Sequence, residues 1–179
     1  MKPTETLEHD HELILQVIDA AVQEVEKSSD CNWDKLEQML DFFVNFADRC
    51  HHAKEENLLF PRLAERGLPR DGGPLGVMLM EHVAGRGYLK TTREALPKAR
   101  QGDKTAGATA RKGILDYAEL LRAHIHKENM VLFHIANELL TAADQRELTA
   151  AFETADPKDL GPDAQARYHA LAQKLTGKH

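Results

Sequence analysis

Cysteine is scarce in this sequence: only Cys31 and Cys50 occur among its 179 residues. Two cysteines exclude the disulfide framework that stabilises small secreted domains. The chain also lacks any run of roughly 18 apolar residues, which excludes an evident membrane-spanning helix. Residues 1–10 are polar and charged, without the apolar segment of a signal peptide. These absences favour a cytoplasmic location.

Positive charge is in short supply as well. The sequence has 23 Lys and Arg residues against 29 Asp and Glu residues, which gives a formal net charge of -6. A nucleic-acid-binding protein needs a basic face that displaces counterions from phosphates. We therefore expect no nucleic-acid partner and no membrane partner.

Alternating β-strand patterns are also absent, and glycine and proline fall in a few clusters. The remaining pattern predicts long helices over residues 5–27, 33–66, 74–100 and 108–140, and short helices over 143–154 and 162–175. Residues 28–32 form a break that offers caps, Gly67 stops the second helix, and Pro74 suits the first turn of the third. Pro97 marks a kink or an early end.

These elements predict an all-α protein, an up-down antiparallel four-helix bundle with one or two short C-terminal helices. We expect the bundle to occupy residues 1–142. Residues 143–179 would form a helical extension packed on the bundle. We expect a monomer or a weak homo-oligomer.

Histidine is abundant, with ten residues. Two segments, 51–60 and 124–133, share the pattern His-x-x-Lys-Glu-x-x-x-Leu-Phe. Single histidines, His11 and His82, lie in the first and third predicted helices, each close to an acidic residue. The order His, His-x3-Glu, His, His-x3-Glu is an internal repeat that chance spacing does not readily produce.

The spacing explains the pairing of residue types. Residues four apart lie one helical turn apart on the same face, so His51 with Glu55, and His124 with Glu128, can each present two ligand atoms to one point. Imidazole and carboxylate together suit iron, manganese or zinc. Two facing glutamates could bridge two ions.

The apolar stripe of each predicted helix carries a histidine at its middle, and the second and fourth also carry a glutamate. A carboxylate buried without a partner is very costly, and metal ions would remove that cost. The candidate metal ligands are therefore His11, His51, Glu55, His82, His124 and Glu128.

A rival register pairs His52 with Glu56 at the same spacing. Its line through Asp41, Asn45 and Asp48 is polar, and its counterparts in the fourth helix, Ile125 and Asn129, cannot serve as an equivalent pair. We expect His52 to be a near neighbour of the site.

The sequence does not assign a single role to several other side chains near the repeat. Asp10 and Glu81, each directly before a histidine, are either acceptors that orient neighbouring imidazoles or solvated helix charges. The roles of Cys50, Tyr117 and Arg86 stay open.

The segment 46–61, with His51, His52 and Glu55, resembles bacterial hemerythrin-like (HHE) cation-binding domains, and so does the segment 76–82 that ends in Glu81-His82. The resemblance covers roughly residues 4–140. It implies a bundle holding two non-haem iron ions, as an oxo- or hydroxo-bridged centre, with the same six residues as ligands. It also implies binding of O2 or related small molecules.

This sequence departs from the oxygen-carrying hemerythrins at two positions. Arg86 stands where they have a second histidine one turn after the ligand of the third helix, and the last carboxylate is Glu128, four residues after His124. One iron would thus lose a nitrogen ligand, which favours peroxide, nitric oxide or iron-handling chemistry over reversible O2 storage. The expected partner is a small diatomic or peroxide ligand.

Two alternatives use the same residues. One is a di-iron enzyme with peroxidase-like, catalase-like or ferroxidase activity. The other is a non-enzymatic iron or oxygen sensor. The sequence does not decide whether the protein is an enzyme.

Overall fold

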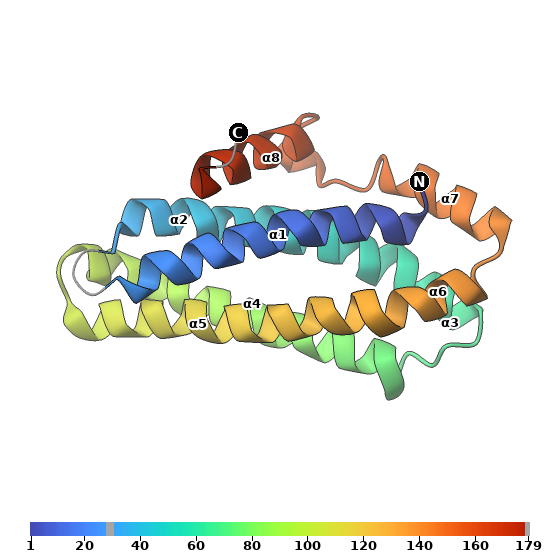
Figure 1. Ribbon diagram of the computed structural model, residues 1–179, viewed down its shortest axis with the longest axis horizontal. Helices are drawn as coiled ribbons and strands as arrows, with labels where there is room; N and C mark the ends of the chain where they lie inside the picture. Colours follow the sequence, from blue (N-terminus) through green and yellow to red (C-terminus); the bar gives the residue numbers. More distant parts are fainter. Residues whose placement is uncertain (28–30, 178–179) are drawn as a thin grey trace.

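The computed structural model describes residues 1–27 and 31–177. Long helical rods run side by side along its length (Figure 1). They are, first, α1 (Pro3–Glu26); second, α2 (Trp33–Phe42), η1 (Phe43–His52), η2 (Glu55–Leu59) and α3 (Phe60–Glu65); third, α4 (Gly73–Arg100); and fourth, α5 (Lys104–Lys127), η3 (Glu128–Leu132) and α6 (Phe133–Leu139). The described residues contain no strand, and the predicted all-α bundle is confirmed.

The ends of the rods follow local capping chemistry. The Asn32 side chain accepts a hydrogen bond from the backbone N–H of Lys35, and it thereby caps α2. Gly67 adopts a φ of 96° directly after the second rod, a conformation that favours glycine. The α4 helix continues past Pro97 to Arg100, as the predicted range 74–100 has it, so of the two alternatives at Pro97 the early end does not occur. Ser28, Ser29 and Asp30 of the expected break, and His179, lie outside the described residues.

The second and fourth rods are not uniform α-helices. Each changes to π-helical turns, η1 and η2 in the second rod and η3 in the fourth. These turns contain His51, Glu55 and Glu128. Wide π-turns inside α-helices are rare and occur frequently at functional sites, so they single out one level of the bundle.

Two apolar clusters fill the bundle at different levels. The first contains Ile14 and Ala47, and the second contains Leu7 and Leu59. On each rod the predicted ligands stand between residues of the two clusters, as His11 does between Leu7 and Ile14. The bundle therefore encloses a polar layer with packed hydrocarbon above and below it.

The C-terminal segment forms α7 (Ala142–Phe152), the short η4 (Lys158–Leu160) and α8 (Ala164–Thr176). Figure 1 shows α8 lying over α1 and α2, and its Tyr168, Ala172 and Leu175 join the first apolar cluster. The α7 helix contributes Leu148 and Phe152 to the second cluster. None of the described helices combines the length and apolar character needed to cross a membrane.

Candidate metal centre

All six predicted ligands meet inside the bundle, one from α1, one from α4 and two from each of the other rods. They form, with His52, two overlapping groups whose ligand atoms lie within 4.8 Å of one another. We call the group of His11, His51, Glu55 and Glu128 the α1 half-site. The group of His52, Glu55, His82 and His124 is the α4 half-site.

The two glutamates each reach into both half-sites. Oε1 of Glu55 lies 3.6 Å from Nε2 of His51, and Oε2 lies 3.4 Å from Nε2 of His82. Oε2 of Glu128 lies 3.1 Å from Nε2 of His11, and Oε1 lies 3.2 Å from Nε2 of His124. Each carboxylate therefore places one oxygen beside an imidazole of each half-site.

These carboxylates are fully buried, with 0% exposure. Among the described residues, none of the four oxygens of Glu55 and Glu128 makes a hydrogen bond, and neither does Nε2 of His11 or His51, although these atoms lie 3.1–3.6 Å from imidazole or carboxylate neighbours. Leaving buried polar atoms unpaired costs several kcal/mol in sum, at about 1–3 kcal/mol each. A cation placed among these atoms would remove that cost, so the residues present fit metal ions.

The outer nitrogen of every imidazole in the two groups faces an oxygen acceptor, which favours the tautomer with the proton on Nδ1. Nδ1 is paired with Asn129 for His11 (2.7 Å), Asp10 for His51 (3.3 Å), Asp48 for His52 (3.2 Å), Glu56 for His82 (2.7 Å) and Glu81 for His124 (2.9 Å). Such acceptors fix the ring orientation of metal-binding histidines and raise their basicity. The unprotonated Nε2 atoms are then available to metal.

Two of these Nε2 atoms approach each other closely. Nε2 of His82 lies 3.1 Å from Nε2 of His124. Both rings donate from Nδ1, so in their neutral forms two Nε2 lone pairs would repel each other at this distance. A proton on one of the two nitrogens turns the contact into a hydrogen bond, and a metal ion beside them also removes the repulsion. The contact therefore calls for positive charge at this level of the bundle, which a proton on one of the rings or a metal ion can supply.

The charges of the site point the same way. Burial, followed by repulsion from Glu128, raises the pKa of Glu55 well above its ordinary value of 4.5. Burial acts in the same direction on Glu128, but His124 and His11 outweigh it and hold the pKa of that carboxyl well below 4.5. Burial lowers the pKa of His51 to about 4, although Asp10 opposes this. The site therefore disfavours two bare carboxylates and accommodates positive charge.

The α-helical periodicity of the sequence placed His52 on a polar, outward face of its helix, whereas the structure buries it. This side chain is only 5% exposed, although its line along an ideal α-helix is polar. A π-turn is wider than an α-turn, so successive residues rotate by less, and His51 and His52 both turn toward the bundle interior. Glu56 joins neither group; it accepts from His82 and from Arg86 instead.

The orienting acceptors were only partly recognisable in the sequence. Asp10 and Glu81 do orient imidazoles, but these belong to other rods. Asp10 accepts from His51 and Glu81 accepts from His124, and neither orients the histidine beside it in the chain. Asn129, Asp48 and Glu56 were not identified as acceptors. An acidic residue four positions before His52 was the one local signal for Asp48.

Cys50 and Tyr117 stand apart from the two groups. Burial, followed by the charge of Asp156, raises the pKa of the Cys50 thiol to about 12, so it is not a thiolate at neutral pH. The Tyr117 ring is buried against Phe43, and its hydroxyl has no hydrogen-bond partner within the described part of the chain.

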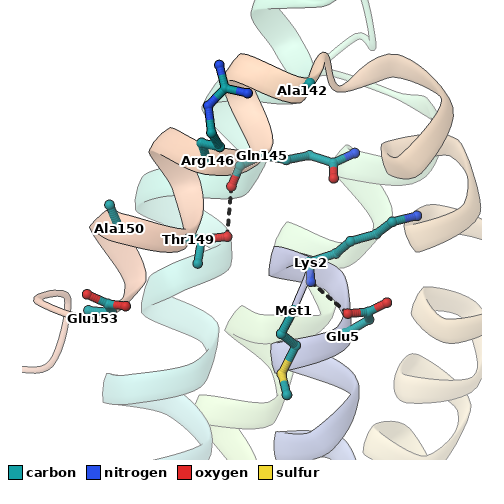
Figure 2. Close-up of a pocket in the computed structure, with 9 residues that line it drawn as sticks. All are labelled: Met1, Lys2, Glu5, Ala142, Gln145, Arg146, Thr149, Ala150 and Glu153. Atoms are coloured by element: carbon teal, nitrogen blue, oxygen red, sulfur yellow. Dashed lines mark hydrogen bonds between the residues drawn. The ribbon is translucent and has the colours of Figure 1, made fainter.

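A surface cavity of about 560 Å³ lies elsewhere, between the N-terminus and α7 (Figure 2). Its lining includes Met1, Lys2, Gln145 and Glu153 and none of the residues of either half-site. In Figure 2 the labelled polar side chains come from the N-terminal segment and from α7, and they do not point toward one common place. This cavity therefore offers no counterpart to the His and Glu groups of the interior layer.

The sequence model of the hemerythrin HHE cation binding domain matches residues 2–136, a range that contains all six predicted ligands. The chain belongs to this family. Cation binding by an HHE domain agrees with the buried His and Glu groups described above.

Curated relatives share this HHE region at low identity. Uncharacterized protein Rv1995 of Mycobacterium tuberculosis strain H37Rv and Uncharacterized protein Mb2018 of Mycobacterium bovis are each 22% identical to this chain over 140 residues. The aligned region is 78% of this chain and 53% of each relative, so the chain spans about half the length of the curated relatives it matches. No solved structure matches this HHE domain.

Proposed function

We propose that this protein binds two iron ions, one in each half-site, and that the pair binds O2 or related small molecules such as peroxide or nitric oxide. One observation carries the proposal: Glu55 and Glu128 each set one oxygen toward an imidazole of the α1 half-site and the other toward an imidazole of the α4 half-site. A carboxylate in this position is suited to bridge two ions.

The donor set supports iron without a thiolate ligand. His11, His51, His82 and His124 would be terminal nitrogen ligands, and the two glutamates would bridge. Imidazole and carboxylate oxygen suit iron, and they also accept manganese and zinc, so metal analysis is part of the test. When bound, the two ions would supply binding positions and electrons for a small oxidant.

The rest of the chain prepares the layer for that chemistry. The Nδ1 acceptors hold each imidazole with its Nε2 inward, as Asn129 does for His11. The apolar clusters on both sides keep bulk water away: His11 stacks on Phe133 at 5.5 Å between ring centroids, and His82 stacks on Phe60 at 6.0 Å. Low water access strengthens the electrostatic interactions within the layer.

The test compares wild type with the double variant Glu55→Gln, Glu128→Gln. Gln keeps the side-chain shape and removes both negative charges. In the wild type we expect about two irons per chain and the near-ultraviolet absorption bands of oxo-bridged iron. The variant should lose both the iron and these iron-dependent bands. The matched control is Glu65→Gln with Glu138→Gln, exposed residues on the same two rods, which should keep full iron content.

The small-molecule step is tested separately. Wild-type protein loaded anaerobically with ferrous iron is titrated with O2, peroxide and nitric oxide in turn. A saturable change of the optical spectrum with one of them supports the proposal and identifies the ligand. If iron binds but none of the three changes the spectrum, the metal site stands and the small-molecule role is wrong. A wild-type protein that takes up no metal contradicts the whole proposal.

A further inference from the structure

His52 is a buried imidazole beside the proposed iron pair that the six-ligand set does not use. Its ring lies 3.9 Å from that of His82, between centroids, and 5.7 Å from that of His124. One of its ring nitrogens lies within 4.8 Å of ligand atoms of Glu55, His82 and His124. The other members of that group are the residues proposed to hold the α4 ion.

The tautomer of His52 leaves its inner nitrogen free. Nδ1 of His52 lies 3.2 Å from a carboxylate oxygen of Asp48, to which it donates. Nε2 is therefore the nitrogen with an available lone pair. This arrangement is the same as that of the four histidines already assigned, each of which donates from Nδ1 to an oxygen of a neighbouring side chain.

Arg86 connects the acceptor of His52 to the acceptor of His82. Its guanidinium donates to Asp48 from Nε (2.9 Å) and to Oε1 of Glu56 from Nη2 (2.7 Å). Oε1 of Glu56 in turn accepts from Nδ1 of His82 (2.7 Å). We call Asp48, Glu56 and Arg86 the Arg86 clamp. One planar cation thereby fixes both carboxylates, and through them both imidazoles.

We propose that His52 is a third imidazole ligand of the α4 half-site and that Arg86 is a positioning residue that holds His52 and His82 through Asp48 and Glu56. The inference rests on the proposed two-ion function. The α4 ion would then have three nitrogen donors and the two bridging glutamates, against two nitrogen donors and the same glutamates for the α1 ion. The sparser α1 half-site is where a small molecule would find an open position.

The sequence led to a different expectation, because Arg86 stands where a second histidine of the third rod would supply a nitrogen. In the structure the second rod supplies that imidazole through the π-turn at His52, and Arg86 lies outside it. The additional imidazole thus comes from the second rod and not from the third. Arg86 of the third rod instead holds Asp48 and Glu56, the acceptors for His52 and His82.

The first experiment counts ligand imidazoles in the wild-type protein loaded with Co²⁺, a paramagnetic substitute for the iron. Every ligand histidine keeps a proton on Nδ1, so each gives one strongly shifted, exchangeable N–H signal in the proton NMR spectrum. We expect five such signals. Four signals, with two Co²⁺ bound per chain, would overturn the assignment of His52 and leave the two-ion proposal intact. A wild type that binds no Co²⁺ and no iron would overturn both.

The second experiment replaces His52 with Phe, which keeps an aromatic ring against His82 but removes the nitrogen. We expect the loss of one of the five signals and a weakening of Co²⁺ affinity in one half-site of at least tenfold. The control His126→Phe changes an exposed histidine and should alter neither. Unchanged affinity and an unchanged signal count in His52→Phe would show that His52 only packs on His82.

The positioning role of Arg86 has its own readout. In Arg86→Met, we expect faster hydrogen exchange of the Nδ1–H signals of His52 and His82, while the other three stay unchanged. Affinity for the α4 ion should fall by about tenfold, the lower end of the range for groups behind metal ligands. Arg86→Lys should recover part of the loss. Equal acceleration of all five signals would indicate general loosening of the bundle and would overturn the role of the clamp.

Discussion

The two half-sites share Glu55, and Glu128 of the α1 half-site also reaches His124. Both orient their imidazoles through Nδ1, yet they are supported from opposite directions. Behind the α1 half-site, Asp10 is buried and lies 3.6 Å from the buried amine of Lys54. Behind the α4 half-site, Asp48 and Glu56 are held by Arg86, whose side chain is 39% exposed. The α1 half-site is therefore supported from the interior and the α4 half-site from the surface.

This difference shows that similar repeated segments can be supported by different interactions, with different consequences for stability and for metal binding. A charge buried with its partner contributes to the fold, because removing one member leaves the other unpaired in a low-dielectric interior. A partly exposed ion pair contributes little to the fold, because water and salt screen it. We therefore expect changes behind the α1 half-site to alter stability and metal binding together, and changes behind the α4 half-site to alter mainly metal binding.

The largest expected effect comes from emptying one half-site at a time. His11→Ala with His51→Ala should leave about one ion per chain, bound by the α4 half-site with its three imidazoles. His82→Ala with His124→Ala should leave clearly less than one ion per chain, because the intact α1 half-site offers two imidazoles where the α4 half-site offers three. Metal analysis after gel filtration distinguishes the two. Equal retention by both variants would contradict the proposed asymmetry.

The next effect concerns the buried amine. Lys54→Met should lower the free energy of unfolding of the apoprotein by about 2–3 kcal/mol, because Asp10 then keeps only its contact with His51. Arg86→Met should cost about 1 kcal/mol or less. Urea unfolding of the metal-free variants measures both. A larger loss in Arg86→Met than in Lys54→Met would reverse the comparison between interior and surface support.

Asn129 gives a third, smaller test on the α1 side. It is the acceptor for His11, at 2.7 Å. Asn129→Leu removes that acceptor at similar volume, and metal affinity of the α1 half-site should fall by about 10- to 100-fold. Competitive titration against a chelator measures the change. Asn137, an amide later in the same rod that is bonded to Thr4, provides the control Asn137→Leu, for which affinity should stay within twofold. An equal loss in the control would rule out a specific role for Asn129.

The smallest effect separates the two glutamates in the metal-free protein. Burial and repulsion from Glu128 make a charge on Glu55 unfavourable, so Glu55→Gln should raise apoprotein stability by about 1 kcal/mol, or roughly 2–4 °C in Tm. Glu128→Gln should give no such gain, because His124 and His11 stabilise that carboxylate. Thermal unfolding with chelator present measures both. A gain of the same size in both variants would mean that the two glutamates are equivalent without metal.

The sequence predicted most of the fold because the local signals agreed with one another. Apolar stripes of helical period, the cap at Asn32 and the stop at Gly67 all act within a few residues, so most rods could be placed nearly to their observed ends. The start of the fourth rod was the exception, because the cap at Asp103 was not recognised and α5 begins at Lys104 instead of residue 108. The tail helices were expected as well, whereas the domain boundary near residue 142 stays a prediction.

The sequence by itself determined which six residues approach one another. Two His-x3-Glu segments and two single histidines each interrupt an apolar stripe, and burying four such stripes together must bring them to one level. That inference needs only the period of a helix. It could not determine the face that His52 takes, because the π-turns that rotate it arise where the rods pack around the polar layer.

Only the tertiary structure decided what supports the ligands. The acceptors for His11, His51, His82 and His124 come from other rods, with Asp10 reaching His51 across 41 positions and Asn129 reaching His11 across 118. No local pattern records such pairs, because they depend on how the rods are aligned along the bundle. Periodicity thus selects the residues that enter the core, and the packing of the rods selects which of them are held in place to bind metal.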